Sequence, residues 1–170
     1  MNTWFTSDCH MGHSNLIIKH HCRPFDTIEE HDETLIQNYN SMIKSNDIVY
    51  CLGDFAWKDP KKYLQRLSGC WILILGNHDS KDVYTAGFQF VKDTYFTKIN
   101  DQYIYMSHYA HRVWNRSHYG SIHTYGHSHG QLEGIGKSMD VGVDCNNYYP
   151  FSFEQIIAKL KDKPILDHHI

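Results

Sequence analysis

The apolar residues in the first half of the chain fall into short runs separated by longer amphipathic stretches. The runs at residues 2–7, 47–52 and 71–75 are rich in aromatic and β-branched side chains, which predicts buried strands. Between them, apolar residues recur at helical spacing from residue 28 to 42, and a second helix is predicted over 60–69. This alternation predicts parallel strands whose carboxyl ends lie along one edge of a sheet.

The second half of the chain has a different, β-rich pattern. Alternating residues on either side of Asn100-Asp101 predict a hairpin. Ser152 and Gln155 have the spacing of a capping box at the start of a last helix. We expect the strands of this half to be more antiparallel than those of the first. The remaining predicted elements are strands at residues 95–99, 102–107, 122–125 and 139–144, and short helices at residues 16–20 and 80–86.

Residues with metal-binding side chains follow several of the predicted strands. Asp8 and His10 come after the first strand, and an extended backbone would place both side chains on one side. Cys9 would then face the other way, so we interpret it as a packing residue. Any one such turn is more typical of an ordinary polar loop than of a metal site, so the hypothesis depends on their number. The candidate ligands are Asp8, His10, Asp54, Asn77, His108, His127 and His129.

This set of ligands indicates the kind of site that they would form. It is too large for one tetrahedral ion and suits two divalent ions that share a carboxylate. Oxygen and nitrogen ligands without thiolates suit Mn, Fe, Zn, Co or Ni. A structural zinc protein would use a closed, cysteine-rich site, and no cysteine occupies a candidate position. The five cysteines also include no C-x-x-C pair, so no disulfide framework is indicated.

Composition sets further bounds. At 170 residues, we expect one domain over residues 1–170. The net charge of −3 gives no electrostatic signal for binding long nucleic acid. No basic-then-apolar signal peptide and no apolar run of membrane-spanning length occur, so we expect a cytoplasmic location and no membrane partner. The sequence does not indicate the oligomeric state.

Taken in order, these motifs resemble those of the calcineurin-like metallophosphoesterases, especially their small bacterial and phage members. The motifs are Asp8-x-His10, Gly53-Asp54, Gly76-Asn77-His78-Asp79, His108 and Gly126-His127-x-His129. The resemblance implies an α/β fold in which a two-sheet β-sandwich is flanked by helices. It further implies that Asp54 bridges two ions. By this resemblance the first ion is held by Asp8, His10, Asp54 and His129, and the second by Asp54, Asn77, His108 and His127.

The resemblance implies hydrolysis of a phosphoester, and the charges involved suggest how. Two cations would neutralise the anionic ester and hold a bridging hydroxide as the nucleophile. The departing alkoxide needs a proton, and His78, next to the ligand Asn77, is the expected general acid. One departure concerns Trp57, which stands where several family members have an aspartate that orients this histidine. His78 must therefore have another partner.

The expected substrate is a small phosphodiester, such as a nucleotide-type molecule. A phosphomonoesterase, a nuclease and a catalytically weak metal-binding interaction protein remain alternatives on the same core. Loops that leave the metal-bearing strand ends should contact the substrate, and Trp114 would offer a face to a planar group. A loop arginine or tryptophan is as commonly solvated or packed as functional. The candidate substrate contacts are His13, Asn15, Arg23 and Arg112.

Overall fold

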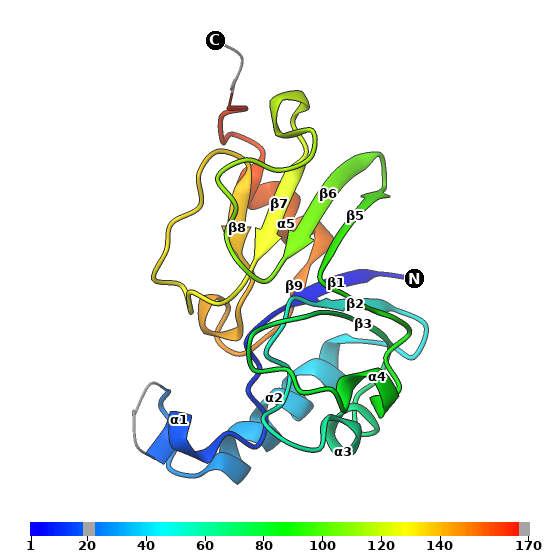
Figure 1. Cartoon of the computed structure of the whole chain (residues 1–170), viewed down its shortest axis with the longest axis vertical. Helices are drawn as coiled ribbons and strands as arrows, with labels where there is room; N and C mark the ends of the chain where they lie inside the picture. The colour runs from blue at the N-terminus through cyan, green and yellow to red at the C-terminus, as the bar shows by residue number, and fades with distance from the viewer. Residues whose placement is uncertain (19–22, 167–170) are drawn as a thin grey trace.

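The computed structural model of the chain describes residues 1–18 and 23–166, which form two β-sheets packed against each other with helices outside (Figure 1). The first sheet has the order β4-β3-β2-β1-β9, and the second has the order β5-β6-β7-β8. This confirms the expected two-sheet α/β architecture. The part of the predicted helix 16–20 beyond Ile18 lies outside the described residues.

The first sheet joins the strands predicted in the first half of the chain. Its four parallel strands are β1 (Thr3–Thr6), β2 (Ile48–Cys51), β3 (Cys70–Ile74) and β4 (Val91–Lys92), and β9 (Phe151–Ser152) pairs antiparallel to β1. Thr6 pairs with Cys51, and Cys51 pairs with Leu73. The ends of β1, β2 and β3 are therefore level, so the segments that follow them leave the sheet side by side.

The second sheet combines one antiparallel pairing with two parallel pairings. Its strands are β5 (Thr94–Ile99), β6 (Gln102–Ser107), β7 (Ile122–Tyr125) and β8 (Ser138–Asp140). Only β5 and β6 are antiparallel, across the predicted hairpin, whereas β7 runs parallel to β6 and β8 runs parallel to β7. The antiparallel character expected of this half is therefore present in the hairpin, whereas the long connections after β6 and β7 return the chain in the same direction and make the other two pairings parallel. Consequently β6 and β7 also present their carboxyl ends at one edge.

In the described part of the chain, five helices flank the sheets, and two hydrophobic cores hold the layers together. The helices are α1 (Ser14–Ile18), α2 (Ile28–Met42), α3 (Pro60–Leu64), α4 (Val83–Ala86) and α5 (Phe153–Leu160). Leu35 and Tyr39 of α2 pack with Trp4 and Trp71 on the outer face of the first sheet. Between the sheets, Phe5 lies in a core with residues of β2, β3, β6, β7 and α5.

The helix boundaries follow from their caps. The predicted capping box of α5 forms, with Ser152 and Gln155 bonded reciprocally. At α2, Thr27 accepts from the Glu30 amide, but the Glu30 carboxylate accepts from Asp26 instead of returning to Thr27. The predicted helix 60–69 ends at Leu64. Among the described residues, no helix is long and apolar enough to cross a membrane.

A contact between the two sheets completes the frame of the site. Ser7, directly after β1, bridges to Gly142, just after β8, and the Val143 amide donates to the Ser7 carbonyl at 3.0 Å. The Gly126 amide, after β7, donates to the carbonyl of His108, after β6, at 2.9 Å. These bonds bring the ends of the β1, β6, β7 and β8 strands to one place, where the candidate ligands are found.

Candidate active site

The structure gathers candidate ligands from both sheets into two overlapping groups. One group contains Asp8, His10 and His129, and the other contains Asp8, Asp54 and His108. Within each group, one ligand atom per residue lies within 4.8 Å of the others. Residues more than one hundred positions apart in the sequence thus meet because the strand ends are level.

Asp54 lies between two imidazoles. Its Oδ2 atom is 3.6 Å from His10 Nε2 and 3.5 Å from His108 Nε2. These separations exceed those of a normal N–H···O hydrogen bond, and they are near the roughly 3–3.5 Å between two ligands bound ~2.1 Å from one ion. The Asp54 Oδ1 atom accepts from the His78 amide at 2.8 Å, which fixes the direction of the carboxylate. The donor set therefore fits divalent cations.

The other two predicted ligands lie beside His108. Asn77 Oδ1 is 3.0 Å from His108 Nε2, and the ring of His127 is 5.2 Å from the ring of His108. His127 is exposed and does not belong to either of the two groups. Its backbone amide donates to both carboxylate oxygens of Asp8, at 3.1 and 2.9 Å. The loop that follows β7 is thereby held against the loop that follows β1.

The loops that carry the ligands have an unusual backbone. Five candidate ligands have positive φ angles between 48° and 66°, namely Asp8, His10, Asp54, His127 and His129. A left-handed conformation costs a residue other than glycine roughly 1–2 kcal/mol, so the surroundings must enforce it. Two backbone hydrogen bonds hold this conformation. The Asp8 amide donates to the Gly53 carbonyl at 3.0 Å, and the His10 amide donates to the Asp54 backbone carbonyl at 2.8 Å. The extended backbone expected at Asp8 and His10 was therefore wrong, although both side chains still face the site.

Three glycines that precede ligands allow this close packing. A Cβ atom at Gly76 would collide with the Asp54 carboxylate, and one at Gly126 would lie 2.6 Å from Asp8 Oδ2. At Gly53, where φ is +96°, a Cβ atom would collide with His108 Nδ1. The carboxylates and the imidazole thus pack directly against bare backbone, which larger residues would prevent.

Two further aspartates, the half-buried Asp79 and the buried Asp140, hold the loops together. Asp79 accepts the amides of Asp54, Phe55 and Gly76 at 2.8–3.0 Å, so it connects the loops after β2 and β3. It therefore bonds to backbone amides and does not join either ligand group. Asp140 accepts the Gly130 amide and the Ser128 hydroxyl at 2.9 and 3.1 Å, and so holds the turn that carries His127 and His129.

The electrostatics of the cluster favour added positive charge. Burial raises the pKa of Asp8 to about 6, although His129 and His108 act in the opposite direction. Burial, together with the nearby Arg23 guanidinium, lowers the pKa of His10 to about 2. A buried carboxylate beside a neutral imidazole, as at Asp8 and His10, forms the kind of site in which a cation compensates charge that solvent does not reach.

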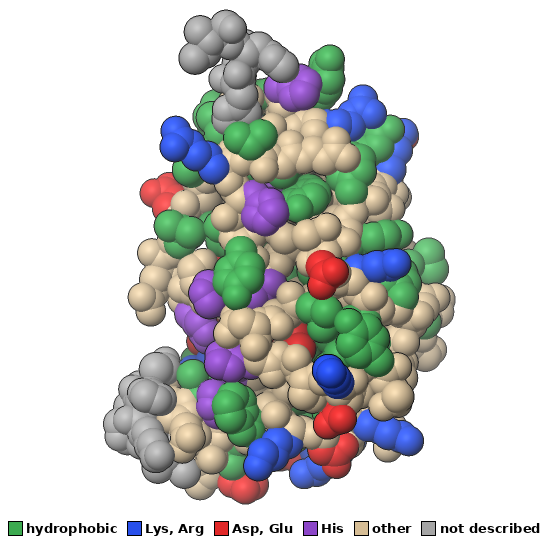
Figure 2. All heavy atoms as spheres, viewed as in Figure 1, with side chains coloured by type: hydrophobic (Ala, Val, Ile, Leu, Met, Phe, Trp, Pro, Cys, Tyr) green, Lys and Arg blue, Asp and Glu red, His purple; other side chains and the backbone are tan. Residues whose placement is uncertain are grey.

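His78 lies at the exposed side of the cluster among other rings. Its ring is 5.5 Å from His10 and 5.6 Å from Trp57. Among the described residues, no carboxylate bonds to this ring, and the indole of Trp57 lies beside it. His13 stacks face to face on Trp57 at 4.2 Å. Figure 2 shows histidine side chains gathered in a column on this face of the molecule, with hydrophobic side chains beside them.

The structure places Arg23 behind the cluster and not at its rim, which corrects its prediction as a substrate contact. Its side chain is fully buried and pairs with Asp144 through two bonds of 2.8 Å. The sequence suggested the rim because Arg23 follows the His10 loop closely. The guanidinium turns inward because two backbone carbonyls and the half-buried carboxylate of Asp144 offer it bonds there.

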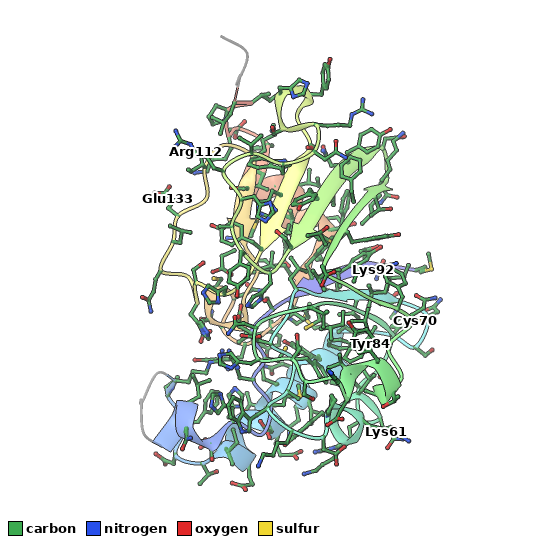
Figure 3. All side chains as sticks on the ribbon, in the orientation of Figure 1. Lys61, Cys70, Tyr84, Lys92, Arg112 and Glu133 are labelled. Carbon is green, nitrogen blue, oxygen red and sulfur yellow. The ribbon has the colours of Figure 1, made fainter. Side chains whose placement is uncertain are left out.

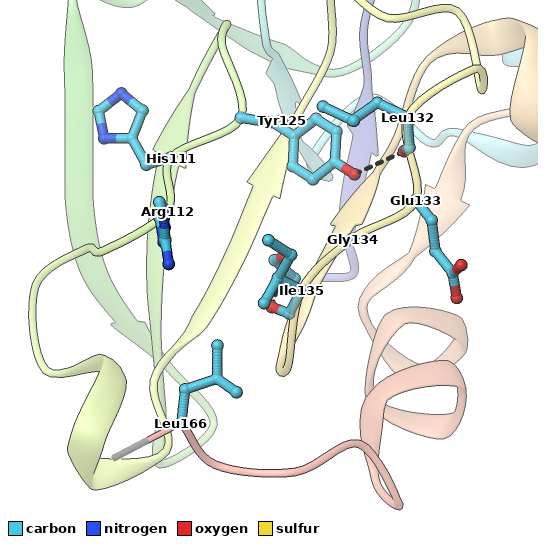
Figure 4. A pocket seen from close by; sticks show the side chains of 10 residues that line it. His111, Arg112, Tyr125, Leu132, Glu133, Gly134, Ile135 and Leu166 are labelled. Carbon is cyan, nitrogen blue, oxygen red and sulfur yellow. Dashed lines mark hydrogen bonds between the residues drawn. The ribbon is translucent and has the colours of Figure 1, made fainter. Parts of the chain in front are cut away.

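Arg112 and Trp114 also lie elsewhere than predicted. Arg112 lines a pocket of about 450 Å³ on the second sheet, together with Ile135 and Leu166, and none of the described lining residues is a candidate ligand (Figure 4). Figure 3 shows it near Glu133, away from the loops that follow the first sheet. Trp114 is buried, and its indole donates to the Ser121 carbonyl. It therefore offers no open face.

The two remaining candidate substrate contacts, His13 and Asn15, lie in different surroundings, and a further ring at the cluster has no counterpart among the candidates. His13 lies at the cluster, 5.6 Å from His10, and Asn15 is exposed on α1. Tyr109 was missed, although it directly follows His108. Its ring is 4.6 Å from His127, and its hydroxyl donates to Asn77 Oδ1 at 3.3 Å.

The profile of the calcineurin-like phosphoesterase family matches residues 1–169 of the chain. The uncharacterised protein MJ1445 of Methanocaldococcus jannaschii is 32% identical over 174 residues, covering 94% of this chain and 91% of that protein. The Gene 66 protein of Mycobacterium phage L5 is 41% identical over 86 residues, covering 46% of this chain and 40% of the phage protein. These relatives confirm the resemblance to small family members.

Solved structures agree with the fold. AQ665 of Aquifex aeolicus, a protein of unknown function, is 26% identical with a TM-score of 0.76, covering 94% of this chain and 98% of that one. An archaeal phosphodiesterase is 17% identical with a TM-score of 0.54, covering 84% of each chain, and this likeness concerns the fold alone. With the family profile extending over nearly its whole length and carboxylates and histidines gathered at its strand ends, the chain belongs to the calcineurin-like phosphoesterase family and is a metal-dependent phosphoesterase.

Proposed function

We propose that the protein is a phosphodiesterase that uses two divalent cations and acts on small diesters, including nucleotide-type molecules. The observation that carries this proposal is the position of Asp54 Oδ2, at nearly equal distances from His10 Nε2 and His108 Nε2. One oxygen between two imidazoles that belong to different ligand groups suits a carboxylate shared by two ions. Asp54 is therefore the expected bridge.

The remaining ligands divide on either side of Asp54. Asp8, His10 and His129 would hold the first cation, and Asn77, His108 and His127 would hold the second. Asp8 also lies within reach of the second group, so it stands near both positions. When bound, such a pair of cations neutralises the phosphate and makes hydroxide available near neutral pH. Mn, Fe, Zn, Co and Ni all suit these ligands.

His78 would donate the proton to the leaving group. Its backbone amide is fixed by Asp54 Oδ1, and its ring lies beside His10 at the exposed side of the cluster. Asn77, its neighbour, faces His108. A proton from the His78 ring can therefore reach the oxygen of a leaving group at the side of the cluster where Trp57 and His13 lie.

The rim of the cluster favours a diester over a monoester. Exposed aromatic rings flank the ligands on two sides, with Trp57 beside His78 and Tyr109 beside His127. A phosphate with two substituents can place one against each ring. The two arginines predicted to hold phosphate, Arg23 and Arg112, do not lie at the rim. A diester carries less negative charge than a monoester and needs fewer such contacts.

Metal dependence and substrate class are tested together. Protein treated with a chelator should lose activity, and added Mn²⁺ or Co²⁺ should restore it. The restored enzyme should hydrolyse bis(4-nitrophenyl) phosphate at least ~10-fold more efficiently, by kcat/KM, than 4-nitrophenyl phosphate, because only the diester uses both rings. A faster monoester reaction would favour a phosphomonoesterase, and faster cleavage of single-stranded oligonucleotides would favour a nuclease. Two bound ions without turnover would favour a metal-binding interaction protein.

The role of His78 is tested with two diesters that differ only in their leaving group. His78→Gln should keep both cations and lose ~10²–10⁴ in kcat on methyl phenyl phosphate, because phenolate needs protonation as it leaves. On methyl 4-nitrophenyl phosphate the loss should be much smaller. His118→Gln, on a turn outside the cluster, serves as the control. Equal losses on both substrates would show that His78 only positions the phosphate.

The two aromatic rings should act on different substituents. Because His78 lies beside Trp57, the leaving group should contact Trp57 and the retained group should contact Tyr109. Stacking on a planar group contributes about 1–3 kcal/mol. Tyr109→Leu should therefore raise KM about 5–100-fold for bis(4-nitrophenyl) phosphate but little for methyl 4-nitrophenyl phosphate. Trp57→Leu should raise KM for both.

Two controls accompany this comparison. Tyr109→Phe keeps the ring and removes only the bond to Asn77, and Tyr84→Leu removes an exposed ring on α4. KM values for Tyr109→Leu and Trp57→Leu that match those of Tyr84→Leu would contradict a role of the two rings in binding substrate.

A further inference from the structure

A buried ion pair lies directly behind the candidate ligands. Arg23 Nε and Nη2 donate to the two carboxylate oxygens of Asp144, each at 2.8 Å. The Arg23 side chain is 0% exposed and that of Asp144 is 16% exposed. Burial alone would raise the pKa of Asp144, but the bonds from His129 and Arg23 outweigh it and bring the pKa to about 2. Asp144 is therefore an anion that neither ligand group includes.

Asp144 fixes the orientation of His129. The Asp144 Oδ2 atom is 2.7 Å from His129 Nδ1. Since a carboxylate can only accept, Nδ1 carries the proton of this bond, and Nε2 is the nitrogen turned toward Asp8, 3.9 Å away. A carboxylate that selects the tautomer of a metal-binding histidine also makes the histidine a better ligand.

Arg23 fixes the loop after β1 at the same time. Its Nη2 atom donates to the Asp8 carbonyl at 2.6 Å, and Nη1 donates to the Cys9 carbonyl at 3.2 Å. Asp8 and His10 on this loop have left-handed backbones, which need such support. One guanidinium therefore connects Asp144, and through it His129, with the backbone of Asp8.

A second pair of side chains, His31 and Asp32 of α2, also supports Arg23. Its Nη1 atom is 2.8 Å from His31 Nε2, and His31 Nδ1 is 2.9 Å from Asp32 Oδ1. Both oxygens of Asp32 accept from the Gly12 amide, at 3.2 and 3.0 Å. The chain from Asp32 through His31 to Arg23 thus contacts the loop after β1 at both of its ends.

We propose that Arg23 and Asp144 are positioning residues that set the affinity of the first cation position. They act by holding His129 in one tautomer and by holding the Asp8–His10 loop in its left-handed conformation. The proposal rests on the proposed function, because it takes Asp8, His10, Asp54 and His129 as the ligands of that cation. Stability alone is a weak reason for such a pair, because well-packed apolar residues often replace buried ion pairs without loss.

The test measures cation binding. Calorimetric titration of cation-free protein with Co²⁺ or Mn²⁺ gives the two dissociation constants, and the Co²⁺ absorption spectrum reports ligand geometry. Asp144→Asn keeps the shape of the side chain and removes its charge, and Arg23→Lys keeps the charge and removes the planar fork. Each should raise one dissociation constant ~10–100-fold, the usual effect of losing a partner behind a ligand, and leave the other within about threefold.

A matched control is present elsewhere in the chain. Arg66 and Glu33 form the same two-bond pair at 2.8 and 2.7 Å, but both side chains are largely exposed. Glu33→Gln should leave both dissociation constants and the Co²⁺ spectrum unchanged. Thermal melting in the presence of chelator shows whether each variant folds.

The wild-type protein also supplies a test that needs no variant. In zinc-loaded protein with ¹⁵N-labelled histidine, His129 should show a protonated Nδ1 and a Nε2 with the shift of a metal-bound nitrogen. A metal-bound Nδ1 would overturn the proposal. The proposal would also be overturned if Asp144→Asn kept both dissociation constants and the Co²⁺ spectrum of the wild type, even if its melting temperature fell. Wild type that binds a single cation would contradict the dinuclear function, and weaker binding of that cation by Asp144→Asn would still support the positioning role.

Discussion

The level ends of β1, β2 and β3 are the constraint on which the site depends. Parallel pairing in a single register brings Thr6, Cys51 and Leu73 into line, so the turns after the three strands start side by side. Each turn must then reverse sharply and still direct a polar side chain to one point. Left-handed backbone at Asp8 and Asp54 achieves this. A shift of register by one residue would move every apolar side chain to the wrong face and also separate the ligands.

Holding these turns together requires polar groups inside the protein. Asp79 and Asp140 accept backbone amides from the ligand loops, and Asp144 pairs with Arg23 behind them. Each of these carboxylates satisfies several donors, which is what makes its burial tolerable. Asp8 has fewer backbone donors, because its carboxylate accepts from the single amide of His127, and burial raises its pKa, as it also does for Asp79. The carboxylates that support the ligand loops therefore accept bonds from more donors than the carboxylate of Asp8, which is itself a candidate ligand.

Much of this arrangement could be predicted from the sequence. The apolar runs located β1, β2, β3 and β7, and the order of the motifs identified every residue of the two ligand groups. Local signals were sufficient there because strands and their turns are determined by neighbouring residues. The parallel direction of β7 and β8 could not be predicted, since it depends on how long connections cross the second sheet.

Side-chain direction was the other point that the sequence could not supply. Arg23 and Arg112 both follow ligand-bearing segments, yet one turns into the core and the other lines a separate pocket. No sequence pattern indicated that Asp144 would bond to His129, because this contact forms only when β8 is in place beside β7. The sequence marked Trp57 only as a departure from the expected motif. Its stacking with His13 depends on the pairing of the loops that contain Met11 and Ala56.

The proposed site depends most on Asp54, whose carboxylate would be shared by two cations. Diffraction from crystals grown with Mn²⁺, collected above and below the manganese absorption edge, tests this directly. Two anomalous peaks ~3.5–4 Å apart, both in contact with Asp54 Oδ2, are the predicted result. A single peak, or two peaks of which only one contacts Asp54, would contradict the account.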